Sequence, residues 1–199
     1  MTAHRSSARD LALIASFAAL MAVLGLPGSI TLFGNAVPVT LQTLGVMLAG
    51  SILGARRGFL SMVVFLALVA AGLPLLAGGR GGLAVFAGPS AGYLIGWPIG
   101  AFVIGWMVER RLPAYPVWWG LTANVVGGIG VIYLIGIPVQ AQVLGTKTIV
   151  ATAISALIYL PGDLAKAIIA TFVAAAVHRG YPTHASGHKV DRESATSAS

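Results

Sequence analysis

Two residues of opposite charge, Asp163 and Lys166, lie three positions apart in an otherwise apolar stretch near the end of the sequence. On a helix, residues at this spacing share a face, so the carboxylate and the ammonium can pair. Charged residues inside membrane-spanning helices are rare and usually mark a substrate or ion pathway. Because buried ion pairs contribute little to stability, the pattern favours a functional pair. The alternative is a pair that only fixes helix packing.

Uncharged polar residues extend this candidate pocket. Thr40, Gln42 and Thr43 stand at the start of one apolar segment, and Asn124 and Tyr133 lie in another. Each is either a ligand contact or a hydrogen bond between two helices, which is worth about 0.6 kcal/mol on average. The amide of Asn124 favours a ligand contact, because it needs several partners in lipid.

A glycine-rich loop, Gly78–Gly82, carries the single cation Arg80. As a lid, this loop would offer a guanidinium to an anionic group; the alternative is a solvated turn with an incidental charge. The loop lacks the lysine and the following Ser or Thr of a phosphate-binding loop.

The sequence gives little support for catalysis or for a bound metal. The chain has no cysteine, which excludes a disulfide framework and a thiolate site. All four histidines lie near the two ends, at positions 4, 178, 184 and 188, so none is available inside the apolar segments as a base or a clustered metal ligand. No nucleotide-binding motif is present either. We therefore expect neither an enzyme nor a cofactor.

The composition places the chain in a lipid bilayer. Of the 199 residues, 57% are hydrophobic and 9% are charged, whereas about a quarter of the residues of a soluble domain are charged. Four long windows contain no charge, namely 11–55, 58–79, 81–108 and 112–146. They are continuous rather than alternating, so they predict helices and not a barrel. The net charge of +7 is explained by basic residues at helix ends rather than by nucleic acid.

We predict an all-α, polytopic membrane protein with six transmembrane helices. The expected spans are 8–26, 40–53, 58–73, 92–108, 117–135 and 149–178, the last with Pro161 inside it. The loops on the side of the two termini hold nine Lys or Arg residues and the opposite loops hold two, so both termini are expected in the cytoplasm. The nine are Arg5, Arg9, Arg56, Arg57, Arg110, Arg111, Arg179, Lys189 and Arg192, and the two are Arg80 and Lys147.

Residues 1–179 are predicted to form this membrane domain, and residues 180–199 a disordered polar tail. The first apolar segment is interpreted as a retained helix rather than a signal peptide. It carries small residues at four-residue spacing, Ala15 with Ala19 and Ala18 with Ala22. Small residues permit close helix approach, so this face is either a docking site for a partner membrane protein or ordinary bundle packing.

Several motifs, in order along nearly the whole chain, resemble the BioY family, the biotin-binding S components of energy-coupling-factor (ECF) transporters. They are VPVTLQTLGV at Val37–Val46, GLP at Gly72–Pro74, the glycine-rich loop, GPSAGYLIG at Gly88–Gly96, and PGDLAK at Pro161–Lys166. The family commonly has Gly-Pro-Thr-Gly-Gly-Tyr, so Ser90 keeps a hydroxyl whereas Ala91 loses the positive φ open to glycine.

The resemblance implies a six-helix bundle with a biotin pocket near the outer surface, closed by loops. It implies that Asp163 and Lys166 contact the ligand, and that the alanine-rich first helix docks on a transmembrane coupling protein (the T component), which binds two ATP-binding cassette subunits. It also implies residence in the bacterial cell membrane and tipping of the loaded subunit to release biotin.

Biotin matches these residues chemically. It offers two ureido N–H donors, a ureido carbonyl, an apolar bicyclic core and a carboxylate. Asp163 accepts from N–H groups, and Lys166 or Arg80 suits a carbonyl or a carboxylate, while Tyr93 and Tyr133 would cover the rings. Which charge meets which end stays open. Two other functions also remain open, an S component for another vitamin and a structural subunit, whereas the lack of a histidine in the apolar segments argues against an intramembrane enzyme.

Overall fold

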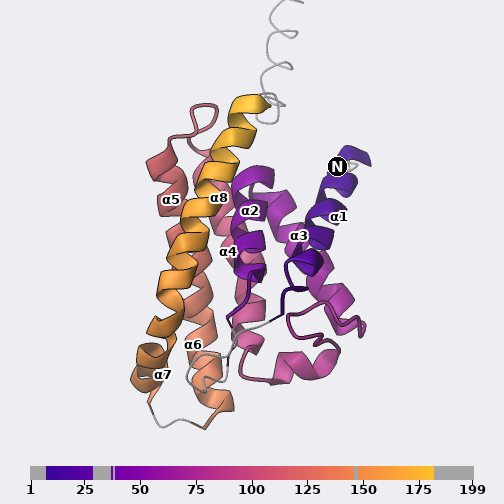
Figure 1. Ribbon diagram of the computed structural model, residues 1–199, viewed down its shortest axis with the longest axis vertical. Coiled ribbons are helices and arrows are strands. Elements are labelled where there is room, and N and C mark those ends of the chain that lie inside the picture. The colour runs from indigo at the N-terminus through magenta and orange to yellow at the C-terminus, as the bar shows by residue number, and fades with distance from the viewer. Residues whose placement is uncertain (1–7, 29–36, 38, 146–147, 182–199) are drawn as a thin grey trace, which may run out of the picture.

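The computed structural model describes residues 8–28, 37, 39–145 and 148–181. Six helical rods run roughly along one axis, and the start of the first and the end of the last lie at the same end of the bundle (Figure 1). Loops at the other end cover the candidate site, so we call it the cavity end. The rods are α1 (Ala8–Val23), α2 (Gln42–Leu53), α3 (Ala55–Ala70), α4 (Ala91–Glu109), α5–η2–α6 (Val117–Val125, Val126–Val131, Ile132–Val143) and α7–η3–α8 (Ile149–Ala156, Leu157–Tyr159, Leu160–Gly180).

The six predicted spans are confirmed, with differences at their boundaries. The fifth rod extends to Val143, eight residues beyond the expected end, because the helix continues through Pro138. Its middle, Val126–Val131, is a π-helical segment rich in glycine, and such segments are frequent at functional sites. A short 3-10 helix, η1 (Leu83–Ala87), lies in the loop between α3 and α4. The predicted tail lies, from residue 182, outside the described residues.

The rods differ in length. Among the described residues, three helices are long and apolar enough to cross a membrane by length and composition, namely Ala91–Glu109, Val117–Val143 and Ile149–Gly180. By contrast α2 has 12 residues, and α1 and α3 have 16 each. At 1.5 Å per residue, α2 is about 18 Å long, well short of the bilayer's hydrocarbon thickness. Loops, and not α2 itself, therefore form the cavity end of the bundle next to the start of α2.

Glycines permit very close packing where α2 turns into α3 and meets α4. A single residue, Gly54, joins α2 to α3 with a φ of 82°, which glycine adopts without strain. The backbone N–H of Ala55 donates to Glu109 at 2.9 Å, so a carboxylate at the end of α4 satisfies the start of α3. Gly105 of α4 lies directly against this turn.

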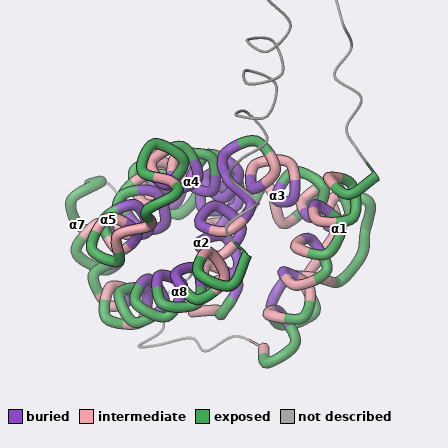
Figure 2. Tube along the Cα trace, turned by 90° about the horizontal axis from the view of Figure 1, so that it is seen from above, coloured by how far each residue is buried: buried purple, intermediate pink, exposed green. Residues whose placement is uncertain are grey.

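The buried residues face the middle of the bundle, with α4 packed on α2, α3 and α6 (Figure 2). One apolar cluster includes Met62, Phe65 and Trp97 at the cavity end, and a second includes Met47, Ile104 and Ala170 towards the chain ends. Many large side chains on the outside are apolar, among them Leu134 and Phe172, as lipid contact requires. The chain is a membrane protein.

The two alanine pairs of α1 lie side by side on one face of the helix and differ in burial. Ala18 is buried and Ala22 packs on the core, where they serve the bundle itself. Ala15 and Ala19 are exposed at the adjacent edge of this face. Only Ala15 and Ala19 are thus available for docking on a partner. The expectation that Ala18 and Ala22 also belong to the docking face is corrected, because these two residues pack within the bundle.

Candidate binding site

A cavity opens at the cavity end of the bundle, among α2, α4, α6, α8 and the loops that precede α2 and α4. The space between its walls is about 590 Å³, open solvent at its mouth included. It is lined by Val37, Val39, Thr40, Gln42, Thr43, Leu76, Arg80, Ser90, Tyr93, Leu94, Trp97, Ile132, Tyr133, Tyr159, Asp163 and Lys166.

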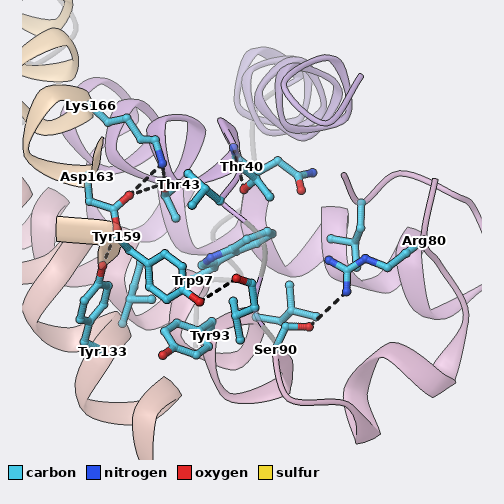
Figure 3. Close-up of a pocket in the computed structure, with 16 residues that line it drawn as sticks. Thr40, Thr43, Arg80, Ser90, Tyr93, Trp97, Tyr133, Tyr159, Asp163 and Lys166 are labelled. Atoms are coloured by element: carbon cyan, nitrogen blue, oxygen red, sulfur yellow. Dashed lines mark hydrogen bonds and ion pairs between the residues drawn. The ribbon is translucent and has the colours of Figure 1, made fainter. Parts of the chain in front are cut away.

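The carboxylate of Asp163 is the centre of a hydrogen-bond network on one wall (Figure 3). Its Oδ1 lies 2.8 Å from Lys166 Nζ and accepts from the hydroxyl of Thr43 at 3.1 Å. Its Oδ2 accepts from Tyr133 at 2.7 Å, and Lys166 also donates to Thr43 at 2.9 Å. Both charged side chains are almost fully buried yet border empty space. The pair thus lies in the cavity wall, where its contact with a ligand stays a prediction.

Each partner of Asp163 is positioned by a local feature of the chain. Asp163 lies in the first turn of α8, just after the 3-10 turn Leu157–Tyr159 and Pro161, so its side chain sits at the level of the cavity. Thr43 lies in the first turn of α2. Tyr133 is the second residue after the π-helical segment, and Ile132, the first, also lines the cavity. Three separate rods thus meet at one carboxylate.

Arg80 lies apart from the Asp163 network on the opposite side of the cavity (Figure 3). Its Nε donates to the carbonyl of Ala77 at 3.2 Å, and its Nη1 lies 3.5 Å from the hydroxyl of Ser90. In the described ranges, the two ion pairs present are Lys166–Asp163 and Arg57–Asp10, and neither involves Arg80. The cavity therefore has a cation without a carboxylate partner at one end and a satisfied acid–base network at the other.

Aromatic side chains form the walls between these two ends. Tyr93 and Tyr133 meet edge to face with their ring centroids 6.0 Å apart. The hydroxyl of Tyr93 donates to Gln140 at 2.7 Å, and that of Tyr159 donates to the carbonyl of Val37 at 2.7 Å. Because these hydroxyls are bound elsewhere, the rings present apolar surface to the cavity, which suits an apolar ring system.

Gln42 lines the cavity, but its amide is fully engaged with the backbone. Its Nε2 donates to the carbonyls of Met21 and Leu75 at 3.1 and 3.0 Å, and its Oε1 accepts from Ala77 N at 3.1 Å. This side chain ties the end of α1 and the loop after α3 to the start of α2. Gln42 thereby shapes the cavity, and its contact with a ligand stays a prediction.

Asn124 lies outside the cavity. Its Oδ1 accepts from Ser51 at 3.0 Å and its Nδ2 donates to Thr171 at 3.1 Å, so it links α5 to α2 and α8. This arrangement corresponds to the helix–helix alternative, and the expectation of ligand contact is corrected. The amide did need several partners, but neighbouring helices supply them.

The cavity contains Trp97 and Tyr159, which the sequence analysis did not name, and gives Ser90 a direct place in the lining. Trp97 follows Tyr93 by four positions, so helical spacing was the available signal for it.

Ala91 is the first residue of α4, and Ser90 before it has a φ of −86°. No positive φ is needed there, so alanine in place of the family's glycine is tolerated.

The polar groups of the cavity suit binding rather than bond cleavage. No histidine lines it, and in the portion that the structure describes no three His, Cys, Asp or Glu residues come together as a metal site would require. The arrangement offers an acceptor and donors at one end, apolar rings in the middle and a cation at the other end. A ligand of matching polarity would be held along its whole length.

Comparison with known proteins identifies the family of the chain. Residues 1–183 match the BioY family. "Biotin transporter BioY" of Rhizobium etli is 47% identical, covering 88% of this chain and 96% of that protein, and "Probable biotin transporter BioY" of Bacillus subtilis is 51% identical, covering 83% and 88%. The crystal structure of the S-component for biotin from an ECF-type ABC transporter superposes with a TM-score of 0.81 at 29% identity, covering 90% of this chain and 95% of that one. The chain belongs to the BioY family.

Proposed function

We propose that the chain is the biotin-binding S component of an ECF transporter and carries biotin across the membrane. The observation that supports this most is the polarity of the cavity, with the Asp163 network at one end and Arg80 at the other. Biotin has the same polarity, with a ureido ring at one end and a carboxylate at the other. Relatives named as biotin transporters over almost their whole length support the same ligand. The protein is a transporter subunit and not an enzyme.

The geometry also suggests the orientation of the ligand. Arg80 has no carboxylate partner among the described residues, so an anionic group at its end of the cavity gains a charge-assisted bond. A carboxylate beside Asp163 would instead meet a like charge. We therefore place the biotin carboxylate at Arg80 and Ser90, and the ureido ring at Asp163, Lys166, Thr43 and Tyr133, with Thr40 and Tyr93 along the wall.

Arg80→Gln tests both the ligand and its orientation. The variant should bind biotin about tenfold more weakly, because a charge-assisted hydrogen bond is worth about 1.5 kcal/mol. Biotin methyl ester, which has no carboxylate, should bind the variant and the unaltered protein equally. Titration calorimetry on the purified protein in detergent measures both ligands.

Arg179→Gln is the matched control, because Arg179 also donates its Nε to a backbone carbonyl, at 3.1 Å, but lies at the far end of the bundle. It should leave both affinities unchanged. A protein that does not bind biotin at all would refute the proposed function, whereas equal losses for biotin and its ester would refute only the orientation.

We further propose that the exposed side of α1, with Ala15 and Ala19, docks on the transmembrane coupling protein of the transporter, which joins it to ATP-binding cassette subunits in the bacterial plasma membrane. α1 packs on α3 and α2 and leaves this side free. Small residues there allow a partner helix to come close. The chain has no nucleotide-binding motif, so energy must come from such partners.

Ala19→Trp should block this docking while leaving biotin binding intact, because the bulky ring fills the space a partner helix needs. Copurification of tagged coupling protein and ATPase subunits should fall at least tenfold. Leu134→Trp is the control, because Leu134 is equally lipid-facing but on α6. If the Ala19 variant retains its partners, the docking face is elsewhere.

A further inference from the structure

Trp97 is the largest aromatic side chain in the cavity wall and is only 5% exposed. It lies on α4 four residues after Tyr93, and its ring packs near Phe65, with the ring centroids 6.1 Å apart. Figure 3 shows it among the lining residues, between Asp163 on one side and Arg80 on the other. Its apolar surface is thus well packed.

The indole N–H of Trp97 is the exception to this good packing, because it is buried without a hydrogen-bond partner among the described residues. By contrast, the hydroxyls of Tyr93, Tyr133 and Tyr159 in the same wall all donate hydrogen bonds. Another indole of the same chain, that of Trp119, donates to the carbonyl of Met107 at 2.7 Å. Buried donors in native proteins almost always have a partner, so an unpaired one at a cavity indicates a missing acceptor.

The position of Trp97 along α4 shows which end of a ligand it would meet. Ser90, which contacts Arg80, is seven residues before Trp97, so Trp97 lies about 10 Å deeper along the helix axis. The inner part of the cavity also holds Lys166 and Thr43, whose polar atoms are bound to Asp163. An acceptor at the inner end of the ligand would therefore face two donors, the Lys166 ammonium and the Trp97 indole.

We propose that the Trp97 N–H donates a hydrogen bond to the ureido oxygen of bound biotin and makes the site selective for a strong acceptor at that position. This inference rests on the proposed function and deepens it. The N–H has no partner among the described residues, and the ureido carbonyl, with two lone pairs, accepts from both Lys166 and Trp97. Trp97 is thus a specificity-determining residue rather than only part of the apolar wall.

Measuring biotin and a second ligand on both the unaltered protein and Trp97→Phe isolates the hydrogen bond from the indole to the ureido oxygen. The second ligand is 2-thiobiotin, in which sulfur, a weaker acceptor, replaces the ureido oxygen. The unaltered protein should prefer biotin, and Trp97→Phe should reduce that preference about five- to tenfold. A general loosening of the cavity would weaken both ligands equally and leave the preference unchanged. Trp106→Phe, at an exposed position on the same helix, should keep the full preference.

A second measurement needs no substitution at position 97. The chain has four tryptophans, and replacing Trp106, Trp118 and Trp119 with Phe leaves Trp97 as the sole indole. With 15N-labelled tryptophan, the remaining N–H resonance should move downfield when biotin is added and much less with 2-thiobiotin.

An unmoved resonance, or an unchanged preference in Trp97→Phe, would overturn the inference. Desthiobiotin, which keeps the ureido group but lacks the sulfur, provides a further check. If the loss of affinity in Trp97→Phe disappeared with this ligand, the acceptor would be the thioether, and the inference would be overturned. Failure of the unaltered protein to bind biotin would instead refute the proposed function, so the two failures are distinguishable.

Discussion

Asp163→Asn is expected to weaken biotin binding by about 30- to 100-fold, because a hydrogen bond to a charged acceptor contributes about 2–3 kcal/mol. It is also expected to lower the stability of the protein. The carboxylate accepts from Tyr133, Thr43 and Lys166 at once, and its loss leaves a buried ammonium without a counter-charge. Breaking a buried ion pair in this way costs about 3–5 kcal/mol. Calorimetry and thermal unfolding in detergent measure the two effects.

The double variant Asp163→Asn with Lys166→Met separates stability from binding. Removing the unpaired ammonium should return most of the lost stability, because neither charge remains buried. Biotin binding should stay weak, since the two charged partners of the ureido ring are gone. Recovery of binding together with stability would show that the pair supports the fold and does not touch the ligand.

Gly105→Ala is expected to disrupt the fold at the opposite end of the bundle. A Cβ at this position would lie 2.6 Å from Ala55 Cα and closer still to the backbone atoms of the turn between α2 and α3. Backbone cannot rotate away as a side chain can, so α4 must move. Overpacking of this kind costs about 1–3 kcal/mol. Thermal unfolding should show a clear fall in melting temperature, with loss of folded protein after extraction.

Gly130→Ala is the matched control, because Gly130 lies in a membrane rod but faces outward, and an added Cβ there meets nothing closer than 3.7 Å. It should unfold at nearly the same temperature as the unaltered protein. If both variants behaved alike, close approach of α4 to the turn would not limit stability.

The helical architecture could be predicted from the sequence because lipid imposes one strong rule. Every backbone group must be satisfied within the span, so uncharged windows of sufficient length become helices. The rule gives no sharp end, however. The fifth rod continues to Val143 through Pro138, and α2 stops at 12 residues because Gly54 allows an immediate turn into α3.

Site residues were predicted best when their type is rare in membrane helices, and least well when their type is common there. Asp163 and Lys166 stood out because charge is scarce in an apolar span, and both line the cavity. Trp97 did not stand out, since an aromatic residue in a membrane helix is ordinary. Gln42 and Asn124 are equally polar in the sequence, and only three-dimensional contacts reveal that their partners are backbone carbonyls and neighbouring helices.

The unequal rods have a consequence for the surrounding bilayer. α1 and α3, on one flank of the bundle, measure about 24 Å each, whereas the rods Val117–Val143 and Ile149–Gly180 on the other flank measure about 40 and 48 Å. Hydrophobic mismatch of this kind is relieved by tilting the protein or by thinning the lipid beside the shorter helices. The membrane would therefore be thinnest along the flank that carries Ala15 and Ala19.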